Sequence, residues 1–242
     1  MTNSNFIFTF ENIERQYKAA QDFGYTFLTC SDYYHLKDDL PEFVIVNRVD
    51  IDISVSNAGK LAQIFNNFGI KATFFVRLHA HEYNPFSFSN YRILKFIKES
   101  GHEIGYHSEI VDQAVIWNEN PEVCLFRDLN ILNNVLDISV KGVASHGGMT
   151  GLNNLDFWKT RAPSEFGLYY EAYDETSNFG LFNDCFYISD SENTRWKCYD
   201  KGVLRANDRR SFGDHLCDKH KLIYLLIHPE IYYHEHPYEL NS

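Results

Sequence analysis

The sequence predicts a single barrel-like α/β domain spanning residues 1–242. Segments with strand-like and helix-like apolar periodicity alternate along the chain, which is typical of repeated β/α units. No proline-rich or serine-rich linker and no internal repeat divides the sequence. The length of 242 residues also fits one α/β barrel, which commonly needs about 200–250 residues.

The first half of the chain carries the clearest alternation. Strands are expected over residues 6–10, 25–29, 43–48, 70–76 and 103–106. The first helix is expected over residues 12–23, before Gly24. The next begins after a cap at Ser54 or Ser56 and ends at Gly69, and a third begins after Ser89 and ends at Gly101. A glycine after the last apolar position of each segment favours a helix end there.

The second half continues the pattern with a weaker signal. A helix over residues 121–136 precedes a strand over residues 140–145, which leads into His146-Gly147-Gly148. Beyond this point, strands are expected over residues 167–173, 186–189 and 221–227, and a helix over residues 208–219. The alternation therefore covers almost the whole chain.

The charge balance argues against two classes of partner. The chain has 22 Lys and Arg residues against 33 Asp and Glu residues, which gives a net charge of −11. Such a charge repels phosphate backbones and anionic lipid surfaces, so we expect neither nucleic-acid binding nor membrane insertion. The apolar run at residues 222–227 is far shorter than the ~20 residues that cross a bilayer. The polar N-terminus resembles no signal peptide, which predicts a cytoplasmic location.

The cysteines do not predict a disulfide framework or a structural zinc site. There are five of them, scattered without any C-x-x-C pair. Cys217 and His220 have a spacing that suits metal ligands, but two residues cannot complete a four-coordinate site.

Polar side chains recur where the expected strands end. This set contains Asp50, Asp52, His107, His146, Asp190 and His228. Functional side chains gather at the carboxyl ends of strands in α/β barrels. Each residue alone could instead be a cap or a hydrogen-bonding group, and their recurrence favours function. Asp50 and Asp52 lie two positions apart, so in an extended segment both carboxylates project to one face. Their repulsion would raise one pKa unless a cation lies beside them.

This set is what metal-assisted hydrolysis needs. A divalent ion such as zinc takes about three protein ligands from histidine and carboxylate and keeps one position for water. A further carboxylate can accept the proton of the attacking water, and a histidine on the opposite side can protonate a departing amine.

Several motifs resemble one known superfamily. The segment RVDID at 48–52 resembles the Arg-His-Asp-Val-Asp signature of a divergent branch of the polysaccharide deacetylases, the NodB-homology or carbohydrate esterase family 4 superfamily. The segment GHEIGYH at 101–107 closely matches the superfamily's GHEIGxH segment. Similar stretches lie at residues 69–75, 83–87, 188–191 with Trp196, and 226–229. The resemblance covers roughly residues 20–233 in the expected order.

The resemblance implies a distorted (β/α) barrel of about seven strands that removes an acyl group from an amide or ester, typically on a sugar. It implies that Asp50 is the general base, and that Asp52 and His107 are metal ligands. It also implies that His228 is the general acid, with Asp190 orienting it. The metal and a backbone N–H near Gly147 would stabilise the oxyanion.

The sequence departs from the superfamily pattern at two positions. Val49 replaces the histidine of the first motif, and Val111 stands where the second histidine ligand normally lies. His146 is the candidate for the third ligand, because its strand occupies the position of the superfamily's third motif. A hydrogen bond to substrate is the alternative role for His146, and Glu109 and Asp112 are alternative ligands that we consider weaker.

Four further residues are candidates for contact with a sugar. Arg48 could bind an acidic group of the substrate or pair with a carboxylate. Tyr83, Asn84 and Trp196 could line the pocket through stacking and polar contacts, although aromatic side chains also build cores.

The resulting hypothesis is a zinc-dependent hydrolase that removes an acetyl or formyl group from an amino-sugar in surface polysaccharide biosynthesis. The alternative is a catalytically inactive barrel that binds a glycan or a protein partner, which Val49 and Val111 favour. A third, weaker hypothesis is hydrolysis of a non-sugar amide or ureide.

Overall fold

The computed structural model describes residues 6–176, 178–192 and 195–234, and it confirms the α/β class. Its centre is a ten-stranded sheet in the order β6-β5-β4-β3-β2-β10-β7-β8-β9, with β1 beside β2. The strands are β1 (Thr26–Leu28), β2 (Val44–Ile51), β3 (Thr73–Val76), β4 (Glu103–Ser108), β5 (Gly142–Ser145), β6 (Tyr170–Glu171), β7 (Phe186–Ser189), β8 (Lys197–Asp200), β9 (Val203–Leu204) and β10 (Leu222–Ile227). All pairings are parallel except β7 with β8 and β8 with β9.

The sheet is a distorted barrel that does not close. The two-residue strand β6 forms one edge, and the antiparallel hairpin β8–β9 forms the other. Within the described ranges, no ladder joins these two edges.

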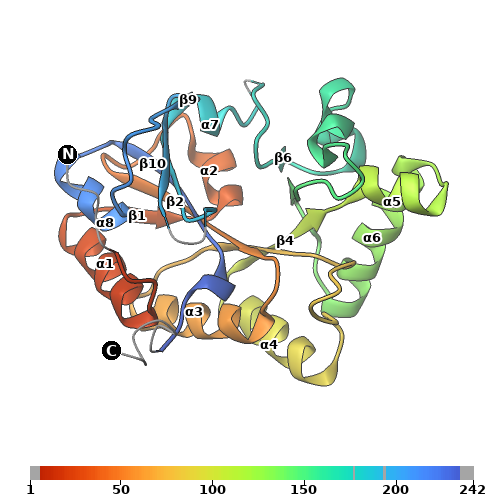
Figure 1. Ribbon diagram of the computed structural model, residues 1–242, viewed down its shortest axis with the longest axis horizontal. Helices are drawn as coiled ribbons and strands as arrows, with labels where there is room; N and C mark the ends of the chain where they lie inside the picture. The colour runs from red at the N-terminus through yellow and green to blue at the C-terminus, as the bar shows by residue number, and fades with distance from the viewer. Residues whose placement is uncertain (1–5, 177, 193–194, 235–242) are drawn as a thin grey trace.

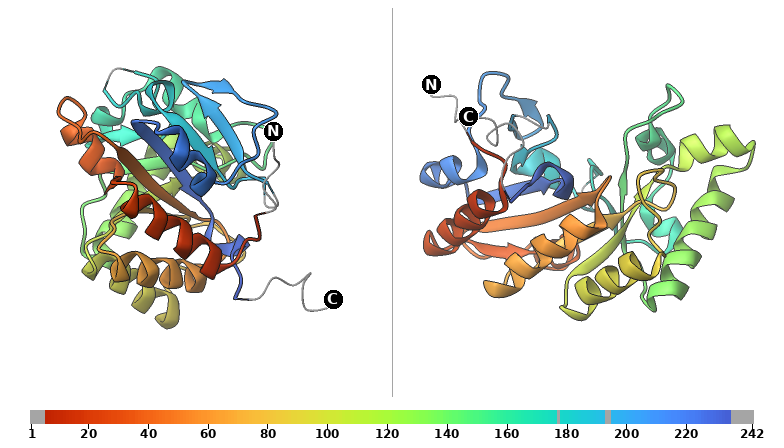
Figure 2. Two further views of the ribbon diagram at one scale, coloured as in Figure 1. Left: turned by 90° about the vertical axis from the view of Figure 1, so that its left-hand side faces the viewer. Right: turned by 60° about the horizontal axis from the view of Figure 1, so that its bottom comes forward.

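The longer helices lie along one face of this sheet, and the short helices after β1 and before β7 pack against its other face (Figures 1 and 2). The α-helices are α1 (Phe10–Asp22), α2 (Cys30–Leu36), α3 (Val55–Asn67), α4 (Phe88–Glu99), α5 (Ile110–Trp117), α6 (Pro121–Leu136), α7 (Leu181–Asp184) and α8 (Phe212–His215). Short 3-10 helices occupy Asn154–Thr160, Pro163–Phe166, Leu216–Asp218 and Pro229–Ile231. Helix α3 contacts α4, and α4 contacts α6, so these three follow one another along the sheet. No helix in the described ranges is long and apolar enough to span a membrane.

Several local expectations differ from the structure, including two in the first half of the chain. Residues 6–10 do not form a strand, because the Thr9 side chain accepts a hydrogen bond from the Asn12 backbone N–H and caps α1, which begins at Phe10. Thr9 retains only an isolated bridge with Tyr233. Ser87 rather than Ser89 caps α4, since its hydroxyl oxygen accepts from the Asn90 backbone N–H. At the second helix, Ser54 is the cap.

Burial explains why the sheet holds its shape. Every residue of β2 is buried, and strands β3 and β5 are also buried throughout. Continuous burial of this kind is typical of parallel strands covered on both faces. The rigid middle of the sheet fixes the residues that follow each strand, and these residues build the site described next.

Candidate functional site

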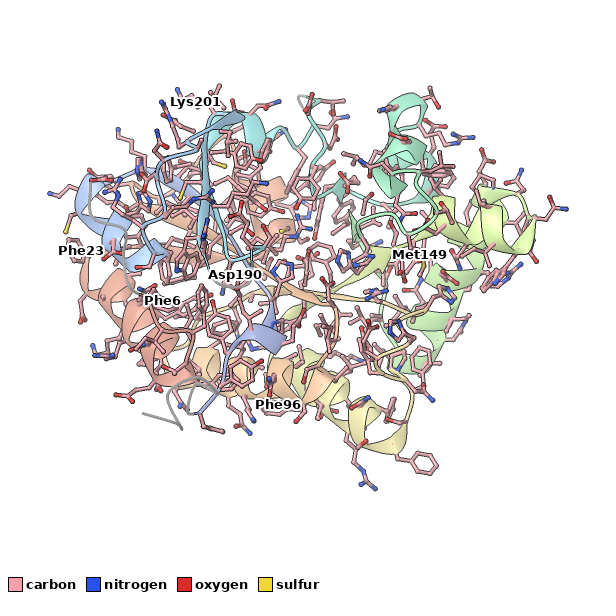
Figure 3. All side chains as sticks on the ribbon, in the orientation of Figure 1. Phe6, Phe23, Phe96, Met149, Asp190 and Lys201 are labelled. Atoms are coloured by element: carbon pink, nitrogen blue, oxygen red, sulfur yellow. The ribbon has the colours of Figure 1, made fainter. Side chains whose placement is uncertain are left out.

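Five strands bring the predicted polar residues to one end of the sheet. Asp50 comes from β2 and Asp52 follows it, His107 comes from β4, His146 follows β5, Asp190 follows β7, and His228 follows β10. All of them except Asp190 line a cavity of about 380 Å³. Asp190, labelled in Figure 3, is fully buried, and its carboxylate lies 2.6 Å from Nδ1 of His228. The structure therefore gathers the whole predicted set, and Asp50 and Asp52 face the same cavity as their spacing predicts.

His107 and Asp52 form the centre of this set. The Nδ1 atom of His107 lies 2.8 Å from the carbonyl oxygen of Ala144, so it must carry a proton to donate. In the neutral ring, Nε2 then has a free lone pair, and it lies 3.1 Å from Asp52 Oδ1 and 3.4 Å from Asp50 Oδ2. Among the described residues, Asp52 Oδ1 is a buried oxygen without a hydrogen bond. His107 Nε2 and Asp52 Oδ1 therefore both direct lone pairs into the space between them, which is an arrangement that suits a bound cation.

The charges around His107 support the same conclusion. Burial opposes protonation of His107, but Asp50 and Asp52 outweigh it and raise the pKa of the ring. For Asp52, burial opposes ionisation, while His107 and the histidines His228 and His146 outweigh it and lower the pKa of its carboxyl group. The pair thus attracts positive charge, whether a proton or a metal ion.

His146 supplies the third potential ligand. Its Nε2 atom lies 3.8 Å from Asp52 Oδ1, and its ring packs edge-on against that of His107. One ligand atom from each of Asp52, His107 and His146 lies within 4.8 Å of the others. This donor set of two imidazoles and one carboxylate is of the kind that zinc takes in catalytic sites.

The two weaker alternatives for the third ligand lie elsewhere. Glu109 Oε1 is 3.5 Å from His146 Nδ1 and accepts a 2.7 Å hydrogen bond from Arg77, so Glu109 lies behind His146. Burial opposes ionisation of Glu109, but His146 and Arg77 outweigh it and lower its pKa to about 2. A carboxylate behind a histidine commonly orients that histidine toward a metal. Asp112 instead accepts hydrogen bonds from the loop after β5, at Met149, Thr150 and Asn154.

Arg48 pairs with Asp50 inside the molecule. The guanidinium donates two hydrogen bonds to the carboxylate, at 2.8 and 2.7 Å, and both side chains are almost fully buried. Burial opposes ionisation of Asp50, but Arg48 and His107 outweigh it and keep its pKa below the ordinary value. Of the two roles considered for Arg48, pairing with a carboxylate is the one that the structure contains, although Arg48 also lines the cavity.

We expect Arg48→Met to lower the free energy of unfolding by about 3–5 kcal/mol, because it leaves the Asp50 carboxylate buried without its partner. Equilibrium unfolding in urea measures the change. The matched control is Arg127→Met, which breaks an ion pair whose side chains are 39% and 38% exposed and should change stability little. Equal small losses in both variants would contradict this account of Arg48.

Asp190 and His228 form a second buried pair. His228 Nδ1 lies 2.6 Å from Asp190 Oδ1, and Asp190 Oδ2 accepts hydrogen bonds from the His228 backbone N–H and the Tyr232 hydroxyl group. Nε2 of His228 faces the cavity, 3.9 Å from Asp52 Oδ2. Burial opposes protonation of His228, but Asp190 outweighs it and, with Asp52 and Asp50, raises the pKa to about 10.

Three of the predicted sugar contacts do not reach the cavity. Trp196 is buried in the core, where it packs against Phe6 and Phe8. Tyr83 donates its hydroxyl hydrogen to backbone carbonyl oxygens next to β2 and β3, which fixes the loop rather than a ligand. Asn84 accepts from the backbone N–H of Phe86 in a local turn. Their side chains are used for packing and loop structure, so these expectations are corrected.

A different group of side chains walls the cavity. Tyr173, Phe182, Tyr187 and Tyr199 line it together with Lys197, whose ammonium group lies 5.3 Å from the centre of the Tyr199 ring. Most of them come from β7, β8 and the segment before β7. The hairpin β8–β9 carries no strong sequence signal, so sequence reasoning missed Lys197 and Tyr199. Tyr173 lies at the end of the strand expected over residues 167–173, but no sequence pattern indicated that its side chain lines the cavity.

No protein-family model matches the chain, and no curated protein matches it in sequence. Its structure is similar to the Streptococcus pyogenes deacetylase PplD in complex with acetate, with a TM-score of 0.41 and 18% identity over 54% of this chain and 59% of that one. The matched region therefore spans less than two thirds of PplD.

Two further solved structures are similar at the same level. The polysaccharide deacetylase Bc1974 from Bacillus cereus has a TM-score of 0.45 and 17% identity, over 82% of each chain. BA3943 from Bacillus anthracis, a carbohydrate esterase family 4 pseudoenzyme, has a TM-score of 0.39 and 16% identity, over 79% of this chain and 60% of that one. At these identities and TM-scores, the likeness assigns neither an activity nor a residue's role to this chain.

Proposed function

We propose that this protein is a metal-dependent hydrolase that removes an N-acyl group, acetyl or formyl, from an amino-sugar. The observation that carries the proposal is the meeting of Asp52, His107 and His146 in one cavity that Asp50 and His228 also line. The amino-sugar substrate and its place in surface polysaccharide biosynthesis follow from the motif resemblance. The aromatic side chains that line the cavity, such as Tyr173 and Tyr199, support a sugar substrate, because aromatic rings offer flat apolar faces to a sugar.

Each side chain has a distinct part in this reaction. Asp52, His107 and His146 would hold a divalent cation, most simply zinc, which when bound lowers the pKa of a water molecule and polarises the acyl oxygen. Asp50 accepts the proton of the attacking water, and Arg48 keeps it ionised for that purpose. His228 is protonated at neutral pH and donates its Nε2 proton to the departing amine nitrogen. A backbone N–H at Gly147, which lines the cavity, would bind the oxyanion.

The test is release of the acyl group from a defined substrate. Zinc-loaded protein is incubated with oligomers of N-acetylglucosamine and with an N-formyl amino-sugar, and free acetate and formate are measured. We expect release from at least one substrate. Absence of release by correctly folded, zinc-loaded protein would contradict the proposal. If the oligomers bound without release, the alternative of an inactive glycan-binding barrel would replace it.

We expect Asp190→Asn to move the alkaline limb of the kcat profile toward lower pH. The Asp190 charge raises the pKa of His228, and the general acid loses its proton as the pH rises through that pKa, so removing the charge brings the loss of activity to lower pH. Tyr232→Phe is the control, because it removes one hydrogen bond to Asp190 and keeps the charge. An unmoved limb in Asp190→Asn would contradict the role of His228 as the acid.

A further inference from the structure

A second cluster of ligand-type side chains lies apart from the cavity, between strand β8 and helix α8. It contains Cys198 on β8, Asp208 on the connecting loop, and His215 at the end of α8. One ligand atom from each of these residues lies within 4.8 Å of the other two. We propose that Cys198, Asp208 and His215 bind a second divalent transition-metal ion, such as zinc, in a structural role.

The distances fit the edges of a tetrahedral site. Cys198 Sγ lies 3.4 Å from His215 Nε2, which lies 3.5 Å from Asp208 Oδ1. Zinc binds sulfur at about 2.3 Å and nitrogen or oxygen at about 2.0–2.2 Å, which places tetrahedral ligands about 3.3–3.6 Å apart. Two of the three donor pairs therefore already have this spacing, and the donors of Cys198 and Asp208 lie within 4.8 Å of each other. Thiolate, imidazole and carboxylate are all zinc ligands, and the thiolate also disfavours the harder cations calcium and magnesium.

Neighbouring charges orient these donors. His215 Nδ1 lies 3.3 Å from Asp218 Oδ2, so a hydrogen bond there leaves the Nε2 lone pair pointing at Cys198 and Asp208. A carboxylate behind the ring is the usual partner of a metal-binding histidine. Arg210 donates to both oxygens of Asp208 and forms an ion pair with Asp218. With the thiol ionised, the cluster holds one thiolate (Cys198), two carboxylates (Asp208 and Asp218) and one guanidinium (Arg210). The resulting net negative charge is balanced by a single divalent cation.

The surroundings of the thiol favour a metal over redox or nucleophilic chemistry. Cys198 and His215 are both fully buried, so neither is accessible to a substrate. The Cys198 thiol is therefore enclosed by protein and has no room for a reacting partner other than a small ion. Metal binding would release its proton to solvent, which makes the affinity rise with pH.

The position of the cluster suggests what the ion does. Along β8, Lys197 and Tyr199 line the candidate active-site cavity. Cys198 lies between them and points to the opposite face of the strand, where it belongs to the same hydrophobic core as Phe212 of α8. A cation held by Cys198 and His215 would therefore tie β8 to α8. The same link would fix the strand that walls the cavity, without any contact with the reacting groups.

Cobalt(II) loading of the full chain tests the site. Cobalt bound to a thiolate gives a near-ultraviolet charge-transfer band, whereas cobalt bound by the Asp52, His107 and His146 set does not, because that set contains no sulfur. We expect the band in the wild-type protein and in Asp52→Ala, its loss in Cys198→Ser, and its retention in the matched control Cys217→Ser, which changes an exposed cysteine. No band in the wild type, or a band that survives in Cys198→Ser, would overturn the proposal.

A second variant protects the test against misfolding of Cys198→Ser. Asp218→Asn changes a part-exposed residue behind His215 and leaves all three ligands in place. We expect it to keep the band but weaken cobalt binding at this site by about 10–100-fold, as loss of the partner of a ligating histidine does. An unchanged affinity would overturn the geometry proposed for His215. Because none of these readouts uses activity, their failure is separate from a failure of the proposed hydrolase function.

Discussion

Asp50→Asn should lower turnover by about 10²–10⁴-fold, the contribution of a well-placed general base. Asparagine keeps the size of the side chain and one acceptor for Arg48, but it cannot take a proton from water. Because Asp50 is not among the three potential ligands, the variant should bind as much zinc as the wild type. Acyl release from an N-acetylated amino-sugar, measured together with zinc content, checks both expectations.

The control for this variant is Asp22→Asn. Asp22 is an exposed carboxylate on α1 that pairs with Lys18 on the surface, so its loss should leave turnover unchanged. Thermal unfolding of both variants establishes that they are folded. Near wild-type turnover in folded Asp50→Asn would exclude Asp50 as the base, and a parallel loss of zinc would mean that Asp50 is a ligand.

His146→Ala should abolish most activity by removing the metal. Mutation of a residue that only hydrogen-bonds a metal ligand typically weakens metal binding by about 10–100-fold. Loss of one of the three ligands themselves should weaken zinc binding by more than that. Zinc affinity is measured by competition with a chelator, and turnover is measured at a zinc concentration that saturates the wild type. His81→Ala is the matched control, since the His81 side chain is 84% exposed and lies outside the cavity.

The outcome for His146 decides between the two roles considered for it. If His146 only hydrogen-bonds the substrate, the variant would keep the wild-type zinc affinity and show a raised KM. If it is a ligand, zinc affinity and turnover fall together, and added zinc restores part of the activity. Unchanged affinity would leave only two ligands, which is too few for a tight site.

Elements with a strong local signal could be predicted from the sequence. The helix over residues 121–136 coincides with α6, where Asn120 caps the first turn and proline occupies its first position. The strand over residues 186–189 coincides with β7. Gly24, Gly69 and Gly101 end their helices with a positive φ, as expected. In each case the signal lies within a few residues, so no tertiary contact is needed to read it.

Short elements held by tertiary contacts could not be predicted. Helix α2 has seven residues, and its first backbone N–H groups bind Thr73 and Glu103, which are distant in sequence. The hairpin β8–β9 depends on pairing with β7. The helix expected over residues 208–219 forms only α8 and one 3-10 turn, because Asp208 is held by Arg210 and Ser211 caps α8.

The candidate site divides in the same way. The strand-end residues could be found because parallel strands bring their carboxyl ends together, whatever their separation in the chain. The contact of Glu109 with His146 could not be predicted, and the sequence could not decide between the two roles considered for Arg48, since both depend on distances between side chains. Trp196 resembled a pocket residue by sequence, yet it fills the core beside Phe8.

Diffraction from crystals grown with zinc tests the central claim most directly. Anomalous scattering locates the ion independently of any assumed ligand. The account predicts an ion bound by Asp52 Oδ1 and by one ring nitrogen each of His107 and His146, at about 2.0–2.2 Å, with Asp50 beside it and not bound to it. A cavity without an ion in zinc-saturated crystals, or an ion held there without His146, would contradict the account.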